Sequence, residues 1–513
     1  MHALPDRRLR VLEPSAGDGA FLGQLAGLMP DHDYVAVDVD ATVVEKLRAD
    51  AGSWPASTEF YAQDFVQYAC DALEDGAPQF DLIVGNPPFI RKHNFPVTFK
   101  DALKRLAERT AYPLQDLKNS WAAFLVASSK LLADDGVVAF VLPYELITVA
   151  YGHAVLRQML EVFGRIDLFV SDEKAFPEIE QDAVVFVGRR MAGSAPSGLY
   201  IQRVEQMFDL AEAVEHPLDV GGARPMALDL NAFLLDPVLM PTLRRVQADF
   251  ETFSDIATSA PGVVTAANEF FILKDADVER LNLWPHVLPI LKKQSIINRS
   301  PIFSERDFEA LAQREPCRLL HVKGQVEDLD PNLQSYIALG VEAGLPDRYK
   351  CRNRKNWYEV RLVKSAPGFF FKRSHGFPRI CVNEAGVHIT DTAYGVHPRE
   401  GHTIRGICFS FYNSLTMLFA ETNGRFYGGG VLELSPSELK MLPIAYHEPT
   451  DQEFEAFLAV HRGAANDAGP ILDFGDQWLK QHPAAAGIDL VSIRKAWSTV
   501  RSHRLRHSNR VKR

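Results

Sequence analysis

The 513-residue chain has no long hydrophobic run and few cysteines. No apolar stretch approaches the ~18 residues that a membrane-spanning helix requires. The N-terminus, MHALPDRRLR, lacks the apolar segment of a signal peptide. The five cysteines are scattered and form no CxxC pair, which is typical of reduced thiols and argues against a zinc site or a disulfide framework. These absences predict a cytoplasmic protein that uses neither a membrane nor a metal.

The chain also lacks an overall positive charge, because its formal net charge is -11. Two segments depart from this balance. Residues 348–379 contain ten basic residues against one acid, and residues 494–513 contain eight basic residues and no acid. An acidic body with cationic segments favours a partner that carries a line of negative charge. For residues 494–513, a solvated tail is the alternative.

Apolar β-branched runs alternate with amphipathic helical patterns through the first 190 residues. This alternation predicts an α/β fold with a doubly wound, mostly parallel sheet. The expected strands are residues 9–14, 34–40, 58–64, 80–85, 136–144, 165–171 and 182–190. Because the last of these follows its predecessor without an intervening helix, we expect it to be antiparallel.

The most informative segment is FDLIVGNPPFI, residues 80–90. Its apolar run is typical of a buried strand, and two prolines end the strand because proline has no N–H. The resulting loop lies at the carboxyl end of a strand, where open α/β sheets place their chemistry. The amide of Asn86, bare carbonyls and the ring of Phe89 suit a planar ring with an exocyclic amino group. A loop that only ends the strand is the alternative.

The turn after the first strand, EPSAGDG, contains Gly17 and Gly19. Glycines at these positions let the backbone approach a ligand closely. Leu22 occupies the position where the dinucleotide fingerprint GxGxxG requires its last glycine. The turn therefore favours a ligand other than a pyrophosphate.

Acidic residues end the second and third strands. The carboxylate of Asp38 can accept hydrogen bonds from ribose hydroxyls. The carboxylate of Asp64 can accept one from an adenine amino group, and the adjacent ring of Phe65 can pack on the base. The alternative for each acid is a helix N-cap.

In this order the motifs resemble the gamma-class, N6-adenine DNA methyltransferases of bacterial restriction-modification systems, the Taq-type enzymes. VLEPSAGDGAF is similar to their S-adenosylmethionine motif, VAVDVD and QDF to the next two motifs, and NPPF to the catalytic motif. AFPEIEQDAVVFV resembles the later segment in which Phe-Pro precedes the last strand. The resemblance covers about residues 9–445 and implies a Rossmann-like class I methyltransferase sheet followed by a mixed α/β target-recognition domain.

The resemblance also implies the cofactor S-adenosyl-L-methionine and the residues that bind it. It implies that the methionyl end faces Glu13, Ser15 and Ala16. It also implies that Asp38 holds the ribose, that Asp64 holds the adenine amino group, and that Pro88 lies against the cofactor. The complete set expected to bind the cofactor is Glu13, Ser15, Ala16, Gly17, Gly19, Asp38, Asp64, Phe65 and Pro88.

The catalytic hypothesis concerns the adenine amino nitrogen, whose lone pair is delocalised into the ring. Two acceptors, the side-chain oxygen of Asn86 and the carbonyl of Pro87, would favour the pyramidal amine and make its lone pair available. A base inside a duplex cannot reach this loop, so the adenine must be flipped out. Phe89 and Phe176 are the aromatic walls expected to stack on it; for Phe176 a core position is the alternative.

The sequence predicts three parts: a catalytic domain at residues 1–225, a target-recognition domain at 226–450, and a helical extension with a basic tail at 451–513. Double-stranded DNA is the expected partner, because arginine binds phosphate and pairs with guanine. The basic residues expected to face DNA are Arg352, Arg354, Lys355, Lys372 and Arg373.

One departure from the family pattern keeps alternatives open. The family carries a helix before the glycine turn, whereas this chain reaches its first strand at about residue 9. Either the start is truncated, another chain supplies the helix, or cofactor binding is weak, and the last case leads to the alternative of a DNA-binding subunit with weak catalysis. A separate alternative is a methyltransferase that uses the same loop on protein glutamine or ribosomal RNA, because the glutamine amide offers similar hydrogens. No nuclease segment is visible, so we expect a restriction endonuclease partner to be a separate polypeptide.

Overall fold

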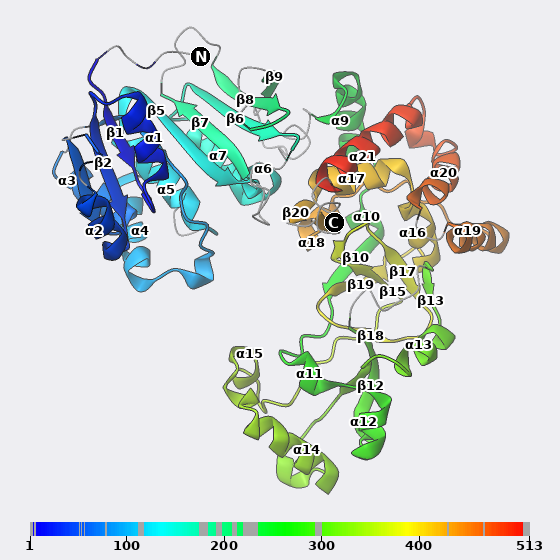
Figure 1. The fold of residues 1–513 in the computed structure, drawn as a ribbon. Helices are drawn as coiled ribbons and strands as arrows, with labels where there is room; N and C mark the ends of the chain where they lie inside the picture. Colours follow the sequence, from blue (N-terminus) through cyan, green and yellow to red (C-terminus); the bar gives the residue numbers. More distant parts are fainter. Residues whose placement is uncertain are drawn as a thin grey trace. The chain divides into compact units, whose positions relative to one another are not determined.

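The computed structural model describes Leu4 and residues 7–505, apart from 51, 53, 56, 77–78, 111–116, 174–182, 191–196, 208–212, 219–233, 293–299, 428–429 and 465–466. The chain divides into two compact units. Figure 1 shows the fold coloured by residue number, from blue at the N-terminus to red at the C-terminus. Unit 1 comprises Met1–Leu234 with Phe426–Gly429 and Leu505–Arg513, and unit 2 comprises Leu235–Arg425 with Gly430–Arg504. The candidate chemistry predicted from the sequence falls in unit 1.

Unit 1 alternates strands and helices, as the apolar patterning predicts. Its elements are β1 (Arg10–Glu13), α1 (Ala20–Leu28), β2 (Asp33–Asp38), α2 (Ala41–Ala49), β3 (Thr58–Ala62), α3 (Phe65–Glu74), β4 (Phe80–Gly85), η2 (Lys92–Asn94), α4 (Val97–Thr110), α5 (Ser120–Leu131), β5 (Leu132–Pro143), α6 (Glu145–Thr148), α7 (Ala150–Met159), β6 (Arg165–Ser171), β7 (Ala183–Arg189), β8 (Gly198–Val204) and β9 (Val214–Leu218).

Among the described residues of unit 1, nine strands form one sheet in the order β3-β2-β1-β4-β5-β7-β6-β8-β9. β1 to β5 pair in parallel, and β7 is antiparallel to both β5 and β6. The predicted α/β class and the antiparallel strand at 182–190 are therefore confirmed. The sheet continues further than the sequence patterning indicated, because β8 pairs in parallel with β6 and β9 pairs antiparallel with β8.

Helices lie on both faces of this sheet (Figure 1). α1 and α2 contribute Leu22, Ala26 and Leu47 to one apolar cluster with the strands. On the other face α3 packs against α4 and α5, and α5 packs against α7. Every residue of α5 except Lys130 is buried, as expected for a helix that is apolar all round. This arrangement places the carboxyl ends of β1, β2, β3 and β4 at one edge, between the two helical layers.

Unit 2 is mixed α/β. Its elements before the C-terminal helices are η6 (Pro237–Leu239), α9 (Met240–Asp249), α10 (Phe253–Ile256), β10 (Ala257–Pro261), α11 (Asn268–Phe271), β11 (Ile272–Leu273), α12 (Asp275–Arg280), η7 (Trp284–His286), β12 (Val287–Leu291), β13 (Ile302–Phe303), α13 (Glu305–Ala312), β14 (Arg318–Leu320), η9 (Val326–Asp328), α14 (Pro331–Glu342), η10 (Leu345–Asp347), α15 (Tyr349–Arg352), β15 (Gly368–Phe371), β16 (Arg373–Ser374), β17 (Ile380–Asn383), β18 (His388–Ile389), β19 (Ala393–Pro398), α16 (Ile404–Phe411), α17 (Ser414–Asn423), β21 (Val431–Glu433) and α18 (Pro436–Lys440). Strand β20 (Arg425–Tyr427) begins at the last residue of this part of unit 2, and its other residues are assigned to unit 1.

Two sheets organise the described part of unit 2. The order of one is β10-β19-β15-β17-β13 and that of the other is β11-β14-β12-β18. Each contributes to an apolar core: Phe271, Leu319 and Tyr358 are buried in one, and Phe369 and Cys381 in the other. The mixed α/β second half that the sequence predicted is what the structure contains.

The C-terminal helices α19 (Asp451–Gly463), α20 (Ala468–Leu479) and α21 (Leu490–Leu505), with η11 (Pro483–Ala485), follow α18. α19 packs on α16, and α20 packs on α16 and α17. Up to Arg504 they belong to compact unit 2. The predicted boundaries between functional domains, at residues 225 and 450, stay a prediction. The division into compact units reports how the chain packs and does not test which part has which function. No helix in the described residues is long and apolar enough to span a membrane.

Candidate active site

A cavity of about 360 Å³ opens at the carboxyl edge of the unit 1 sheet. Its volume falls within the range of about 300–1,000 Å³ that small-molecule sites occupy. All of its lining residues belong to unit 1. They lie at the end of β2, in the loops that follow β1 to β4, and in the first turns of α3, α4 and α5. They are Pro14, Ser15, Gly17, Asp38, Val39, Asp64, Phe65, Asn86, Pro88, Ile90, Phe95, Pro96, Phe99, Ser120 and Phe124.

The two glycines of the turn after β1 have different roles. Both have left-handed backbones, with φ of 52° at Gly17 and 78° at Gly19. Gly17 lines the cavity and has open space where a Cβ would be. A Cβ on Gly19 would lie 2.9 Å from Leu47 Cδ2 and 3.0 Å from the ring of Trp54. Gly19 is therefore required by packing, while Gly17 leaves the backbone accessible from the cavity.

Glu13 and Ala16, both predicted to bind the cofactor, lie behind the cavity wall. Glu13 is buried, and its Oε2 accepts a hydrogen bond from Leu22 N at 2.9 Å. Burial raises the pKa of this carboxyl to about 8. Ala16 is buried as well, and its N–H donates to the Val37 carbonyl at 3.0 Å. In this structure Glu13 holds the start of α1; cofactor contact by either residue stays a prediction.

Asp38 and Asp64 both line the cavity and also bind backbone. Asp38 Oδ2 accepts from Gly17 N at 2.8 Å, and its Oδ1 accepts from Asp40 N at 2.9 Å. Asp64 caps α3 by accepting from Gln67 N at 3.1 Å, and burial raises the pKa of its carboxyl. These contacts orient the two carboxylates, so the N-cap interpretation and the ligand interpretation of Asp64 are compatible.

The loop after β4 contributes Asn86 and Pro88 to the cavity. Asn86 is exposed, and within the described residues its side-chain amide has no hydrogen-bond partner. Its backbone carbonyl accepts from Ser15 Oγ at 3.0 Å. Pro87 is buried and Phe89 is half-buried, and neither lines the cavity. Phe176 lies outside the described residues.

An apolar wall that the sequence analysis did not single out completes the cavity. Phe95 and Phe99 form an edge-to-face pair with ring centroids 4.8 Å apart, and Phe65 packs on Phe124 at 5.0 Å. The signal for Phe124 was present in the sequence, because its helix, SWAAFLVASSKL, is apolar all round and must be buried. The remaining unpredicted lining residues are Pro14, Val39, Ile90, Pro96 and Ser120.

The basic residues expected to face DNA divide into two groups. Arg352, Lys355 and Arg373 are exposed, and Arg373 pairs with Glu433. Arg354 is half-buried and donates to the carbonyls of Val264 at 3.0 Å, Thr265 at 2.7 Å and Trp357 at 3.1 Å.

Lys372 is half-buried like Arg354. Its Nζ donates to the Asp391 carbonyl and lies 4.8 Å from the centroid of the Tyr394 ring. Burial lowers the pKa of this lysine. Arg354 and Lys372 thus hold backbone in place, and DNA contact by any of the five basic residues stays a prediction.

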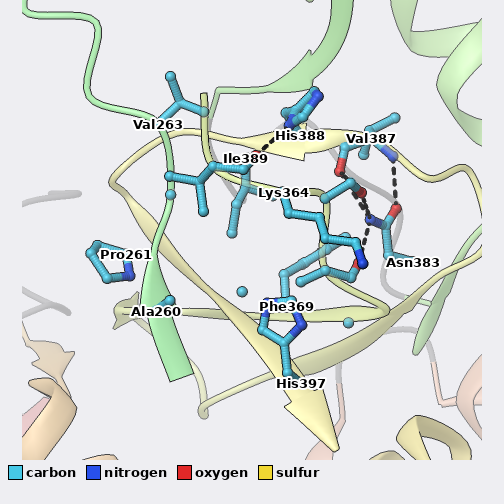
Figure 2. A pocket seen from close by; sticks show the side chains of 16 residues that line it. Ala260, Pro261, Val263, Lys364, Phe369, Asn383, Val387, His388, Ile389 and His397 are labelled. Atoms are coloured by element: carbon cyan, nitrogen blue, oxygen red, sulfur yellow. Dashed lines mark hydrogen bonds between the residues drawn. The ribbon is translucent and has the colours of Figure 1, made fainter. Parts of the chain in front are cut away.

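Other hollows in unit 2 have a different character. The one in Figure 2 has a volume of about 10 Å³, which is room for about one water molecule. In it the Asn383 amide donates to the carbonyls of Ala366 at 2.8 Å and Val387 at 2.9 Å, so it is a packed structural site. An open groove of about 850 Å³ is lined by the loop 264–270 and by Arg348 and Lys350.

The described residues contain no group of three or more His, Cys, Asp or Glu side chains placed to hold a metal ion. All five cysteines are buried free thiols. The chemistry of the unit 1 cavity is therefore built from carboxylates, one free amide, backbone carbonyls and aromatic rings.

Comparison of the sequence with family models identifies the family of this chain. Residues 41–171 match the family described as Eco57I restriction-modification methylase, and residues 229–477 match that described as Type II methyltransferase M.Eco57I, C-terminal domain. The chain belongs to the Eco57I family of restriction-modification methylases. The first match contains Asp64 and Asn86, and the second contains most of unit 2.

Full-length relatives are similar along most of the chain. Type II methyltransferase M.XamI of Xanthomonas campestris pv. amaranthicola is 22% identical over 443 residues, which cover 85% of this chain and 80% of that protein. Type II methyltransferase M.AccI of Acinetobacter calcoaceticus is 22% identical over 447 residues, which cover 84% and 79%. Among solved structures, that of the DrdV–DNA complex aligns with a TM-score of 0.45 at 11% identity, covering 89% of this chain and 54% of that chain.

Proposed function

We propose that this member of the family transfers a methyl group from S-adenosyl-L-methionine to the N6 amino group of a flipped-out adenine in duplex DNA, within a specific sequence. One observation carries the proposal: the free amide of Asn86, the glycine turn and the carboxylates of Asp38 and Asp64 all face one cavity. The family match supports the same reaction class. A restriction endonuclease that cuts the same sequence is the expected companion.

The cavity suits a nucleoside with a charged, extended substituent. Asp38 is oriented by two backbone N–H groups and retains lone pairs for a ribose diol. Asp64 and Phe65 provide an acceptor and an aromatic face for the adenine ring, and exposed Val39 adds an apolar contact. S-adenosyl-L-methionine, when bound, supplies an electrophilic methyl group on its sulfonium.

The NPPF loop acts on the acceptor amine. Asn86 Oδ1 is the first acceptor for an amino hydrogen, and within the described residues the Pro87 carbonyl receives no hydrogen bond that would compete for the second. Two acceptors that draw on the amino hydrogens favour a pyramidal nitrogen with a localised lone pair. Most of the rate enhancement then comes from positioning and from preorganised dipoles that stabilise the developing ammonium.

Delivery of adenine to this loop requires base flipping, at a cost of a few kcal/mol. Stacking on an aromatic ring offsets about 1–3 kcal/mol per contact. Phe89 lies within the NPPF loop and is half-buried, and its ring is the proposed first wall. Phe176 is the proposed second wall.

The proposal is tested by incubating the intact chain with methyl-labelled cofactor and genomic DNA, then sequencing the product for modified bases. We expect label on adenine at one recurrent sequence. Parallel incubations offer a glutamine-containing peptide and ribosomal RNA in place of DNA. Label on either of these, with none on duplex DNA, would replace the proposal by the corresponding alternative. DNA affinity without cofactor binding in calorimetry would identify a DNA-binding subunit.

The first testable prediction concerns Asn86. Asn86→Ala removes the side-chain acceptor, so we expect methyl transfer to fall at least ~10²-fold, as for loss of one preorganised transition-state contact. Cofactor and DNA affinities should change less than about twofold, because the side chain has no partner to release. Initial rates and calorimetric titrations measure these quantities.

Asn94→Ala is the matched control, because Asn94 is also exposed and lies near the loop in η2 but does not line the cavity. It should retain full activity. Turnover of Asn86→Ala close to that of Asn94→Ala would rule out the amide as an acceptor for the amino hydrogens.

A further inference from the structure

The NPPF loop cannot be held by regular secondary structure. Residues 86–90 belong to no strand or helix, and Pro87 and Pro88 have no N–H to donate. A catalytic loop must nevertheless keep its acceptors within a fraction of an ångström of the productive geometry. The contacts that fix this loop must therefore come from elsewhere in the fold.

Two serine hydroxyls provide those contacts, one on each side of Pro87. Ser15 Oγ, from the turn after β1, donates to the Asn86 carbonyl at 3.0 Å. Ser120 Oγ, from the first residue of α5, donates to the Pro88 carbonyl. The middle carbonyl, that of Pro87, has no donor among the described residues.

Ser120 is bound at three points. Besides donating to Pro88, its Oγ accepts from Ile90 N at 2.9 Å, and its own N–H donates to the Ile90 carbonyl at 2.9 Å. The contact continues as Lys92 N donates to the Lys118 carbonyl at 2.9 Å.

The hydrogen-bond roles of Ser120 are fixed. It is 1% exposed, and its helix is buried on every side. Because Oγ has a single proton and already accepts from an amide, that proton must go to Pro88.

We propose that Ser120 is a positioning residue for methyl transfer, which holds the Pro88 and Ile90 peptides and thereby keeps the NPPF loop in the geometry that the reaction requires. The inference rests on the proposed function. Ser120 acts through the loop, and its hydroxyl is already committed to the loop backbone. Its loss should therefore affect the rate of the chemical step more than the binding of either substrate.

The test compares Ser120→Ala with Ser129→Ala. Ser129 is a buried serine of the same helix, and among the described residues its hydroxyl bonds only to the Val126 carbonyl, at 2.7 Å. Its variant therefore matches the loss of one buried hydroxyl. We expect the single-turnover rate on duplex DNA to fall about 10- to 100-fold in Ser120→Ala, the scale on which small misplacements act. Ser129→Ala should retain the wild-type rate, and Ser120→Thr, which keeps the hydroxyl, should recover most of it.

Cofactor affinity by calorimetry and DNA affinity by anisotropy separate positioning from general damage. Both should stay within about twofold of wild type in Ser120→Ala. A Ser120→Ala rate equal to that of Ser129→Ala, or a parallel loss of rate and of both affinities, would overturn the assignment. Absence of transfer to DNA by the wild-type chain would instead overturn the proposed function, so the two failures are distinguishable.

Discussion

At the residue scale, single side chains both line this cavity and hold the backbone around it. Asp38 accepts from the backbone of the glycine turn, and Asp64 caps α3, yet both line the cavity. An acid at the end of a strand is thus oriented by the backbone next to it. Ser15 likewise lines the cavity and binds backbone, because its hydroxyl donates to the Asn86 carbonyl in the neighbouring NPPF loop.

Glu13 gives a testable pH dependence at this scale. Burial raises the pKa of its carboxyl from 4.5 to about 8 in the folded chain. Between these values the unfolded chain releases the proton while the folded chain keeps it, so stability falls as pH rises. The slope reaches at most about 1.4 kcal/mol per pH unit.

We therefore expect the unfolding temperature of wild type, measured relative to Glu13→Gln, to decrease from about pH 5 to about pH 8 and then to level off. Glutamine keeps an oxygen for the Leu22 N–H but does not titrate, so the comparison removes the contribution of every other group. Parallel curves for the two proteins across this pH range would contradict the raised pKa.

At the element scale, the structure corrects the interpretation of the C-terminal basic segment. Residues 490–505 form helix α21. Three of its arginines are anchored to other segments, whereas Lys495 is exposed; the three are Arg494, Arg501 and Arg504. Arg504 forms a fully buried ion pair with Glu421 of α17, with Nε 2.7 Å from Oε2. Its NH1 donates to the His375 carbonyl at 3.0 Å. Arg504 thus binds α21 to other segments of unit 2. Of the basic C-terminal segment, residues 506–513 lie outside the described part.

The Glu421–Arg504 pair predicts a large stability effect. Glu421→Gln leaves the Arg504 charge buried without its counter-ion, so we expect a loss of about 3–5 kcal/mol in the free energy of unfolding. Urea denaturation followed by circular dichroism measures it. Combining Glu421→Gln with Arg504→Met should recover part of the loss, because the uncompensated charge is gone.

Glu455→Gln is the control at this scale. Its pairing with Arg462 on α19 is exposed and 3.8 Å long, so the change should alter stability by no more than about 0.5 kcal/mol. Equal losses of unfolding free energy in Glu421→Gln and Glu455→Gln would show that the buried Glu421–Arg504 pair stabilises the fold no more than an exposed pair does.

At the scale of the whole molecule, the candidate active site lies in unit 1 and a locally basic segment lies in unit 2. The net charge is -11, yet residues 348–379 are strongly cationic. Within that segment Trp357 and Tyr358 pack in an apolar core, while Arg352 and Lys355 are exposed. The exposed cations are thus the ones available to an anionic partner.

This division predicts how DNA affinity responds to salt. Arg352→Ala and Lys355→Ala should each lower the slope of log affinity against log salt by about one unit, as for loss of one phosphate contact. Arg354→Ala should leave the slope unchanged and reduce thermal stability, because three backbone carbonyls lose their donor. Anisotropy titrations over a series of salt concentrations measure the slopes. If only Arg354→Ala lowered the slope, Arg354 would be the residue that contacts phosphate, and the assignment of Arg352 and Lys355 to the DNA surface would be wrong.

The fold of unit 1 followed closely from local patterning. Strands β1 to β7 were expected because apolar β-branched runs end at proline, glycine or acidic residues, and these are local signals. β8 and β9 were missed, because their place beside β6 depends on pairing with residues distant in sequence. Phe95 and Phe99 were missed for the same reason, since nothing local marks which apolar side chains meet across a cavity.

The sequence by itself determined the α/β class, the order of motifs along one sheet edge, and the proline-stiffened loop, because each depends on residues adjacent in the chain. Only the tertiary structure decided that Arg354 and Lys372 bind backbone, that Glu13 lies behind the wall, and that Ser120 fixes the loop. Those outcomes depend on burial and on hydrogen bonds between distant segments, which are set when the chain packs.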